Sequence, residues 1–136
     1  MRTVIFACVH NAGRSQMAAA WLNALGDRGR VRALSAGTAP GDRVHPVVVE
    51  AMREVGIDLG AARPQRLTPA LLASATHLVT MGCGEACPAA PPSVEKSDWP
   101  IADPKGESIE RVRAIRDQIR ARVVDLLAQW RGGPGA

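Results

Sequence analysis

Short apolar runs alternate with longer amphipathic segments along this chain, and this alternation limits its fold more than any other feature. The apolar runs predict β-strands over residues 3–8, 31–35, 76–81 and 94–98. Alternation of strands and helices is typical of a parallel sheet that is covered by helices. We therefore predict an α/β fold, a three-layer sandwich in which a four-stranded parallel sheet is flanked by helices.

Helices are predicted between and after the strands, over residues 15–25, 44–56, 68–74 and 108–130. In the three longer ones, apolar residues recur every three or four positions, as on the buried face of a helix. Thr68 has the residue type of an N-cap. We interpret the arginine-rich side of the last helix as a face in contact with water, formed by Arg111, Arg113, Arg116, Asp117, Arg120 and Arg122.

The length of 136 residues suits one domain. We predict a single catalytic domain over residues 1–131 and a flexible, glycine-rich tail over 132–136. No apolar stretch approaches the ~18 residues of a membrane span, and the apolar run near the start is too short for a signal peptide. We therefore expect a cytoplasmic protein with no membrane partner, and we expect it to be a monomer.

The charge balance argues against a nucleic-acid partner. The chain has 17 lysines and arginines against 13 acidic residues, and its aromatic residues are limited to 3 tryptophans and 1 phenylalanine. A mildly basic surface of this kind fits a small anionic substrate better. Three cysteines in a compartment that keeps thiols reduced indicate redox or metal chemistry in preference to a structural disulfide.

A cysteine ends the first predicted strand and begins the stretch C-V-H-N-A-G-R-S, residues 8–15. A strand, a tight loop and a helix in succession leave backbone N–H groups directed into a concavity at the helix N-terminus, which favours an anion. Cys8 would lie in this positive field as a thiolate. Arg14 could grip two oxygens of a tetrahedral oxyanion, and Ser15 could donate its hydroxyl to the sulfur. The alternative, a buried cysteine beside an exposed arginine, is disfavoured by the asparagine and glycine inside the loop.

These motifs resemble a known family. The stretch C-V-H-N-A-G-R-S-Q-M-A looks like the phosphate-binding loop of the low-molecular-weight tyrosine phosphatase superfamily, which has segments similar to L-S-A-G-T at 34–38 and D-P at 103–104. More narrowly, V-T-M-G-C-G-E-A-C-P at 79–88, with a D-W pair after it, resembles the thioredoxin-coupled arsenate reductases built on that fold. The resemblance extends over residues 4–130.

The resemblance implies an enzyme that reduces arsenate to arsenite, with phosphate or sulfate as a mimic of the substrate. Cys8 would attack arsenate and form a covalent thiol–arsenate adduct whose oxygens are held by Arg14 and by backbone N–H groups. Asp103 would act as general acid for the leaving water. The implied oxyanion-binding residues are Val9, His10, Asn11, Ala12, Gly13, Arg14 and Ser15.

The other two cysteines would carry the electrons. By the same resemblance, Cys83 would attack the sulfur of Cys8, so that arsenite leaves and a disulfide remains. Cys87 would then attack Cys83, which leaves a disulfide that thioredoxin can reduce. Electrons would come from reduced thioredoxin, and no bound cofactor is implied.

A metal site is the main alternative for the cysteine pair, because Cys83 and Cys87 supply two thiolates. However, His77 lies on a predicted strand and His45 in a distant helix, so no second pair of ligands is predicted nearby. Some relatives bind potassium through an acidic residue on the first helix, where this chain has Ala19. We therefore expect no metal ion.

Three other functions stay open. A phosphatase acting on phosphate monoesters would need only Cys8, Arg14 and Asp103, although the absence of tyrosine and the sequence Lys105-Gly106 after the Asp-Pro pair disfavour an aromatic substrate. A non-catalytic thiol module could bind arsenite or sense oxidants. A reductase of the same chemistry could use mycothiol or glutaredoxin in place of thioredoxin.

Overall fold

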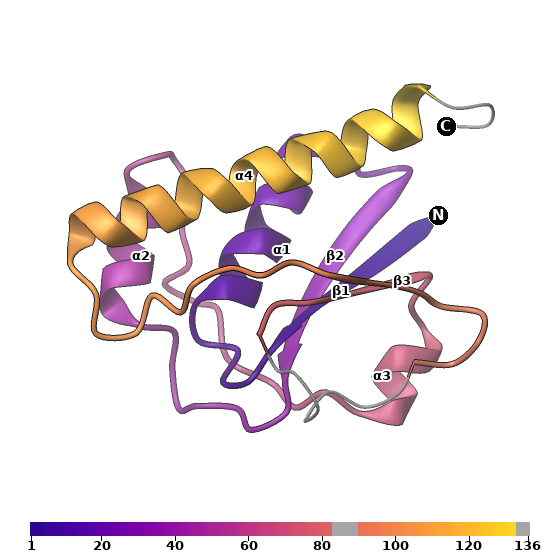
Figure 1. The fold of residues 1–136 in the computed structure, drawn as a ribbon, viewed down its shortest axis with the longest axis horizontal. Coiled ribbons are helices and arrows are strands. Elements are labelled where there is room, and N and C mark those ends of the chain that lie inside the picture. The colour runs from indigo at the N-terminus through magenta and orange to yellow at the C-terminus, as the bar shows by residue number, and fades with distance from the viewer. Residues whose placement is uncertain (83–89, 133–136) are drawn as a thin grey trace.

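The chain folds into alternating strands and helices, as the sequence predicts. The computed structural model describes residues 1–82 and 90–132. Of the predicted tail, only Gly132 lies within these ranges, as the last residue of a helix. In chain order (Figure 1) the elements are β1 (Arg2–Cys8), α1 (Arg14–Leu25), β2 (Val31–Gly37), α2 (Pro46–Arg53), α3 (Pro69–Ala73), β3 (His77–Thr80), β4 (Glu95–Asp98) and α4 (Ile109–Gly132).

The four strands form one parallel sheet in the order β2-β1-β3-β4. Cys8, the last residue of β1, pairs with Gly37 of β2, and Ala7 pairs with Thr80 of β3. From β1 the chain continues to β2 on one side of it, and it later forms β3 on the other side. The connections therefore diverge at the carboxyl end of β1. In α/β sheets ligands bind at such a point, and Cys8 lies there. At the opposite edge from β2, every residue of β4 is exposed.

The side chains of β1 divide the core into two layers, because they alternate between the faces of the sheet. Val4, Phe6 and Cys8 belong to the larger cluster, which also includes residues of α1, α2 and α4. Ile5 and Ala7 belong to the smaller cluster, to which α3 contributes. Figure 1 shows α3 apart from the other three helices. This arrangement confirms the predicted three-layer sandwich.

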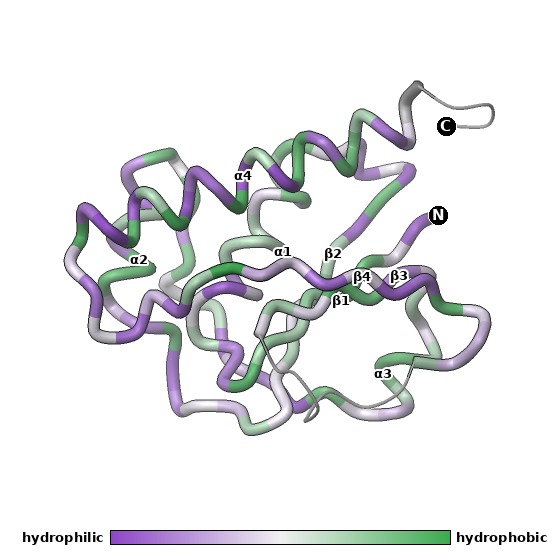
Figure 2. The backbone as a smooth tube through the Cα atoms, viewed as in Figure 1, coloured by the Kyte–Doolittle hydropathy of each residue, from purple (hydrophilic) through white to green (hydrophobic). Residues whose placement is uncertain are grey.

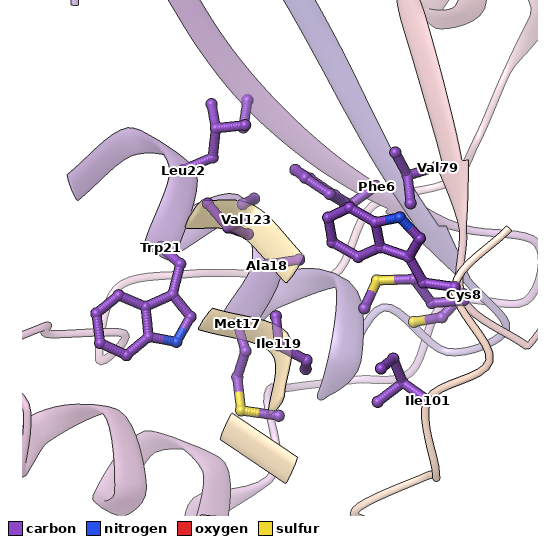
Figure 3. Packing of buried hydrophobic residues seen from close by; sticks show 14 of the residues in the cluster. Phe6, Cys8, Met17, Ala18, Trp21, Leu22, Val79, Ile101, Ile119 and Val123 are labelled. Carbon is purple, nitrogen blue, oxygen red and sulfur yellow. The ribbon is translucent and has the colours of Figure 1, made fainter. Parts of the chain in front are cut away.

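Cys8 is part of the apolar core as well as of the loop that follows it. Figure 3 draws it in one cluster with Phe6, Met17 and Ile101. The residue is only 3% exposed, and the ring of Phe6 lies 5.4 Å from that of Trp99. The position of the sulfur is therefore set by close packing, since a shift of β1 would disturb many buried contacts.

α4 carries the buried stripe that its sequence predicts. Val112, Ile115, Ile119 and Val123 are fully buried, and Figure 2 shows apolar and polar positions alternating along this helix. Burial of such a side chain contributes about 1.5–3 kcal/mol, so the stripe is the main attachment of α4 to the rest of the domain. Within residues 1–82 and 90–132, no helix is both long and apolar enough to cross a bilayer.

The prediction that all the arginines of α4 face water is wrong for Arg116, which is 8% exposed. Its guanidinium donates to the carbonyl oxygen of Ala51 at 2.9 Å, to Glu54 Oε1 at 2.9 Å and to Asp117 Oδ1 at 2.8 Å. Arg113 donates to the same Glu54 carboxylate at 2.6 Å. Periodicity did not reveal these contacts, because they depend on the end of α2 lying under α4.

Two helix boundaries show how local residues set the ends. The predicted helix over 44–56 is shorter and runs from Pro46 to Arg53. His45 is the N-cap of α2. Beyond the end of this helix the chain turns at Gly56, whose φ of 84° favours glycine. Thr68 is the N-cap of α3, as predicted, and its side chain accepts a hydrogen bond from the backbone N–H three residues on.

The ion pairs of Glu54 should make the free energy of unfolding depend on pH in the acid range. Hydrogen bonds from Arg113 are the main cause that lowers the pKa of Glu54 from 4.5 to about 2, with burial opposing and Arg116 adding to the effect. Because the folded pKa is depressed, the ionised carboxylate stabilises the fold at pH values above about 4.5. This contribution is lost as the pH falls towards 2.

We therefore expect Glu54→Gln to have a lower free energy of unfolding than the native protein at neutral pH. The difference should shrink between pH 4.5 and 2, as measured by urea unfolding at a series of pH values. Glu107→Gln, at an exposed position in the segment before α4, is the matched control and should change little. A difference of the same size at pH 2 and pH 7 would contradict the assignment.

Candidate active site at the end of the first strand

The loop of residues 9–13 connects β1 to α1, and α1 begins at Arg14. Gly13 is the N-cap and has no side chain with which to cap the helix, and the first turn contains no acidic residue. The N–H groups of this turn have no acceptor within the helix, so the helix directs its positive end at the loop. The structure thus contains the strand–loop–helix arrangement from which the sequence predicts an anion site.

A directed chain of hydrogen bonds ends on the sulfur of Cys8. The backbone N–H of Gln65 donates to Asn11 Oδ1 at 2.9 Å, and because a backbone N–H can only donate, the acceptor must be the amide oxygen. The amide nitrogen of Asn11 then donates to Ser15 Oγ at 2.7 Å. The hydroxyl of Ser15 lies 2.9 Å from Cys8 Sγ, and it can donate its proton to the sulfur when the sulfur is a thiolate, which can only accept. A hydroxyl oriented in this way stabilises negative charge on the sulfur.

The inner side of the loop is fixed by two glutamines that the sequence does not single out. Asn11 has a φ of 51°, a conformation that asparagine tolerates better than most residues. Gln16 Nε2 lies 3.1 Å from Asn11 O, 3.2 Å from Asn11 Oδ1 and 3.3 Å from Arg63 O. Gln65 has no sequence signal, because its bond to Asn11 joins positions 54 residues apart. Together they tie the loop to the segment around residues 63–65.

The guanidinium of Arg14 lies against three residues from two segments, and Arg14 is 9% exposed. Nη1 donates to the carbonyl oxygen of Ile101 at 3.2 Å, and Nη2 lies 3.7 Å from Asp103 Oδ2. The second segment is at Gly82, where an added Cβ would overlap Nη1 of Arg14. The structure therefore brings two predicted catalytic residues, Arg14 and Asp103, into an ion pair, and a bound oxyanion would compete with Asp103 for this guanidinium.

The Asp103-Pro104 segment packs directly on the loop. A Cβ on Gly13 would lie 2.7 Å from Pro104 Cγ, so a side chain at this loop position would push the segment away. Asp103 Oδ1 also accepts a hydrogen bond from the backbone N–H of Lys105 at 3.0 Å, which orients the carboxyl group. Because the Asp103 side chain is 46% exposed, it can exchange a proton with water, as a general acid requires.

His45 lies beside the loop, as the N-cap of α2 and not within the helix predicted over residues 44–56. Its backbone N–H donates to the carbonyl oxygen of Ala12 at 2.9 Å. Its ring lines a hollow of about 250 Å³ together with His10 and Lys105. Burial is the main cause that lowers the pKa of His45 below 6.5, with Asp103 opposing it. Lys105 and His10 add to the lowering, so these surroundings favour the neutral imidazole.

Cys83 and Cys87 lie outside the described residues, and their predicted roles belong to the proposal below. His77 lies on β3, as predicted, where Nε2 pairs with Glu95 Oε2 at 3.2 Å. Among residues 1–82 and 90–132 no group of three or more His, Cys, Asp or Glu side chains could hold a metal ion.

The sequence profile of the family described as low molecular weight phosphotyrosine protein phosphatase matches residues 3–132. The chain belongs to this family. The matched range includes the loop after β1, all four strands of the sheet and the Asp103-Pro104 segment.

Two relatives are named as arsenate reductases. A protein of Halobacterium salinarum, provisionally assigned to the arsenate reductases, is 42% identical over 129 residues, which cover 92% of this chain and 90% of that protein. The glutaredoxin arsenate reductase of a Synechocystis strain is 34% identical over 133 residues, which cover 95% of this chain and 98% of that protein.

Solved structures of similar fold belong to two kinds of enzyme. The thioredoxin-dependent arsenate reductase of Corynebacterium glutamicum superposes with a TM-score of 0.81 at 35% identity, covering 95% of this chain and 61% of that longer one. An arginine phosphatase of Geobacillus stearothermophilus superposes with a TM-score of 0.84 at 29% identity, covering 97% of this chain and 94% of that one. The fold is therefore common to both activities.

The hydroxyl of Ser15 should control the reactivity of Cys8. Ser15→Ala removes a hydrogen bond to a charged group, and we expect the rate of Cys8 alkylation by iodoacetamide at pH 7 to fall about tenfold. The measurement is made in a Cys83→Ser, Cys87→Ser background, so that Cys8 is the only thiol. Ser74→Ala, which removes an exposed hydroxyl at the end of α3, should leave the rate unchanged. Equal rates for Ser15→Ala and its parent would contradict the directed chain of hydrogen bonds.

Proposed function

We propose that this protein is an arsenate reductase that uses Cys8 as its nucleophile, Cys83 and Cys87 as a disulfide relay, and thioredoxin as its reductant in the cytoplasm. The observation that carries the proposal is the hydrogen-bond chain from Gln65 to Cys8 Sγ beside the helix N-terminus. It suits an ionised sulfur facing an oxyanion. The names of the relatives and the cysteine pair of the sequence support the reductase outcome.

In the first step, Cys8 Sγ attacks the arsenic atom of arsenate. A sulfur–arsenic bond forms while an arsenic–oxygen bond breaks, and the departing hydroxide takes a proton from Asp103 and leaves as water. Arg14 leaves its pairing with Asp103 and binds two oxygens of the anion through its parallel N–H groups. The backbone N–H groups at the start of α1 bind the remaining oxygens.

In the second step, the thiolate of Cys83 attacks Cys8 Sγ. A sulfur–sulfur bond forms as the sulfur–arsenic bond breaks, and its electron pair stays on arsenic, which leaves as arsenite. Cys87 then attacks Cys83, which frees Cys8 and leaves a Cys83–Cys87 disulfide. The dithiol of thioredoxin reduces this disulfide and completes the turnover.

A phosphatase is the second candidate, favoured by the structural likeness to an arginine phosphatase. The same cradle would bind a phosphate monoester, and water would hydrolyse the cysteinyl-phosphate without any second thiol. This reaction needs Cys8, Arg14 and Asp103 but neither Cys83 nor Cys87. The two candidates thus differ in which cysteines they require.

Single cysteine substitutions separate the candidates. We expect Cys8→Ser, Cys83→Ser and Cys87→Ser each to abolish arsenate-dependent NADPH oxidation in the presence of thioredoxin and thioredoxin reductase. In contrast, Cys83→Ser and Cys87→Ser should retain any hydrolysis of p-nitrophenyl phosphate, which Cys8→Ser should lose. Full multiple turnover by Cys87→Ser with thioredoxin would show that the third thiol of the relay is another group.

The choice of reductant has its own test. With arsenate fixed, the native protein is supplied in turn with the thioredoxin system, with glutaredoxin and glutathione, and with mycothiol and its reductase. We expect turnover with thioredoxin alone to equal turnover with all three systems together. Turnover that appears only with glutaredoxin, the reductant named for the Synechocystis relative, would replace thioredoxin in the proposal.

Asp103→Asn should separate catalysis from binding. Loss of the general acid should lower kcat for arsenate by about a hundredfold. The Kd for inorganic phosphate should stay the same or fall, because a neutral side chain no longer competes for Arg14. Asp58→Asn is the matched control, since Asp58 also accepts a hydrogen bond from the N–H two residues on, at Gly60. A variant with native kcat would exclude Asp103 as the acid.

A further inference from the structure

Gly82 lies against the guanidinium of Arg14 with no room for a side chain. A Cβ built on Gly82 would overlap Nη1 of Arg14, and it would lie 3.2 Å from Cζ and 3.6 Å from Nη2. Three atoms of the guanidinium group therefore lie where a side chain at residue 82 would begin. Their positions depend on the absence of a side chain at residue 82.

The backbone conformation of Gly82 is a second, independent reason for glycine at this position. Its φ is 96°, in the region that L-amino acids rarely adopt. The residue before it is firmly held, because Met81 is fully buried and its N–H donates to the carbonyl oxygen of Ala7 at 2.7 Å. Gly82 is thus fixed relative to β1, the strand that ends in Cys8.

We propose that Gly82 is a positioning residue for Arg14 in oxyanion binding, a role that rests on the proposed function of the loop. The guanidinium is enclosed by the bare backbone of Gly82, by the carbonyl oxygen of Ile101 and by Asp103. Ile101 and Asp103 make polar contacts with the guanidinium, whereas Gly82 makes a steric one. The steric contact limits how far the guanidinium can tilt towards residue 82. A fixed tilt matters because two parallel N–H groups bind two oxygens of a tetrahedral anion only in one plane.

This contact also joins the two halves of the proposed reaction. Gly82 is covalently bonded to Cys83, whose thiolate breaks the sulfur–arsenic bond of the adduct in the proposed second step. The arginine that holds the substrate therefore touches the residue next to the thiol that releases the product.

Two glycine-to-alanine variants separate this role from backbone strain. Gly56 has a φ of 84°, close to that of Gly82, but a Cβ built on it would meet nothing within 4 Å. Both Gly82→Ala and Gly56→Ala therefore impose similar strain on the backbone. Gly82→Ala alone displaces the guanidinium of Arg14.

The readout is the concentration of inorganic phosphate that protects Cys8 from alkylation by iodoacetamide, measured in a Cys83→Ser, Cys87→Ser background. We expect Gly82→Ala to need about ten times more phosphate than its parent, as for partial loss of a bidentate contact. Gly56→Ala should need the same concentration as the parent. With the native cysteines restored, Gly82→Ala should raise KM for arsenate more than it lowers kcat.

A double-mutant cycle tests whether the effect passes through Arg14. Arg14→Lys removes the planar fork, so Gly82→Ala should weaken phosphate protection no further in the Arg14→Lys background. Additive losses would show that Gly82 acts by another route and would overturn the proposal. If Gly82→Ala alone does not fold, the doubly substituted protein should fold, since the clash with the guanidinium is gone. Failure of both to fold would also overturn it.

The outcomes distinguish this proposal from the one on which it rests. If phosphate does not protect Cys8 even in the parent protein, the oxyanion site itself is wrong. If phosphate protects the parent and Gly82→Ala equally, the oxyanion site stands and the role of Gly82 is wrong. A matching loss in Gly56→Ala would assign the effect to strain and would likewise overturn it.

Discussion

The pairing of β1 with a strand on each side is the constraint on which the site depends. β2 pairs with the whole of β1, and β3 pairs with residues 4–7 of β1. Because all these strands are parallel, their carboxyl ends and the segments that follow meet at one edge of the sheet. Cys8 from β1 and Gly82, two residues beyond β3, are brought together with the Asp103 segment in this way. A change in register would separate Cys8 from Gly82 and from the Asp103 segment.

Much of this could be predicted from the sequence, since local patterns determined it. The strand that ends in Cys8, the helix that begins near Ser15 and the capping role of Thr68 follow from apolar spacing and residue type alone. The residues that orient the loop from behind could not be found this way. Gln65 and Ile101 act through a backbone N–H and a carbonyl oxygen, which every residue possesses, so their identity carries no signal.

The errors have a related cause. Arg116 has the spacing of a surface residue, yet it is buried because the end of α2 supplies a carbonyl oxygen and the carboxylate of Glu54. His45 was predicted to lie within a helix over residues 44–56, whereas it is the N-cap of α2 and its N–H bonds to Ala12. In both cases the deciding partner comes from an element that periodicity within one segment cannot reveal.

The cradle by itself suits both phosphoryl and arsenic chemistry. Arsenate and phosphate are tetrahedral anions of similar charge, and the N–H groups and guanidinium recognise those shared features. What distinguishes a reductase is the fate of the sulfur–arsenic or sulfur–phosphorus bond. Water is available at a half-exposed site like that of Asp103, so reduction requires a thiol that reaches the adduct before hydrolysis does. Under the proposed relay, Gly82 links the two requirements, because it lies against Arg14 and directly precedes Cys83.

The exposed strand β4 has a consequence for the protein in a crowded cell. An open sheet edge offers unpaired backbone groups to which a strand of another molecule can add. Here that edge bears Glu95, Lys96 and Asp98, all exposed, so an incoming strand would have to cover charged side chains on both faces of the sheet. These charges disfavour further growth of the sheet at this strand, and with it the edge-to-edge pairing that leads to insoluble fibres.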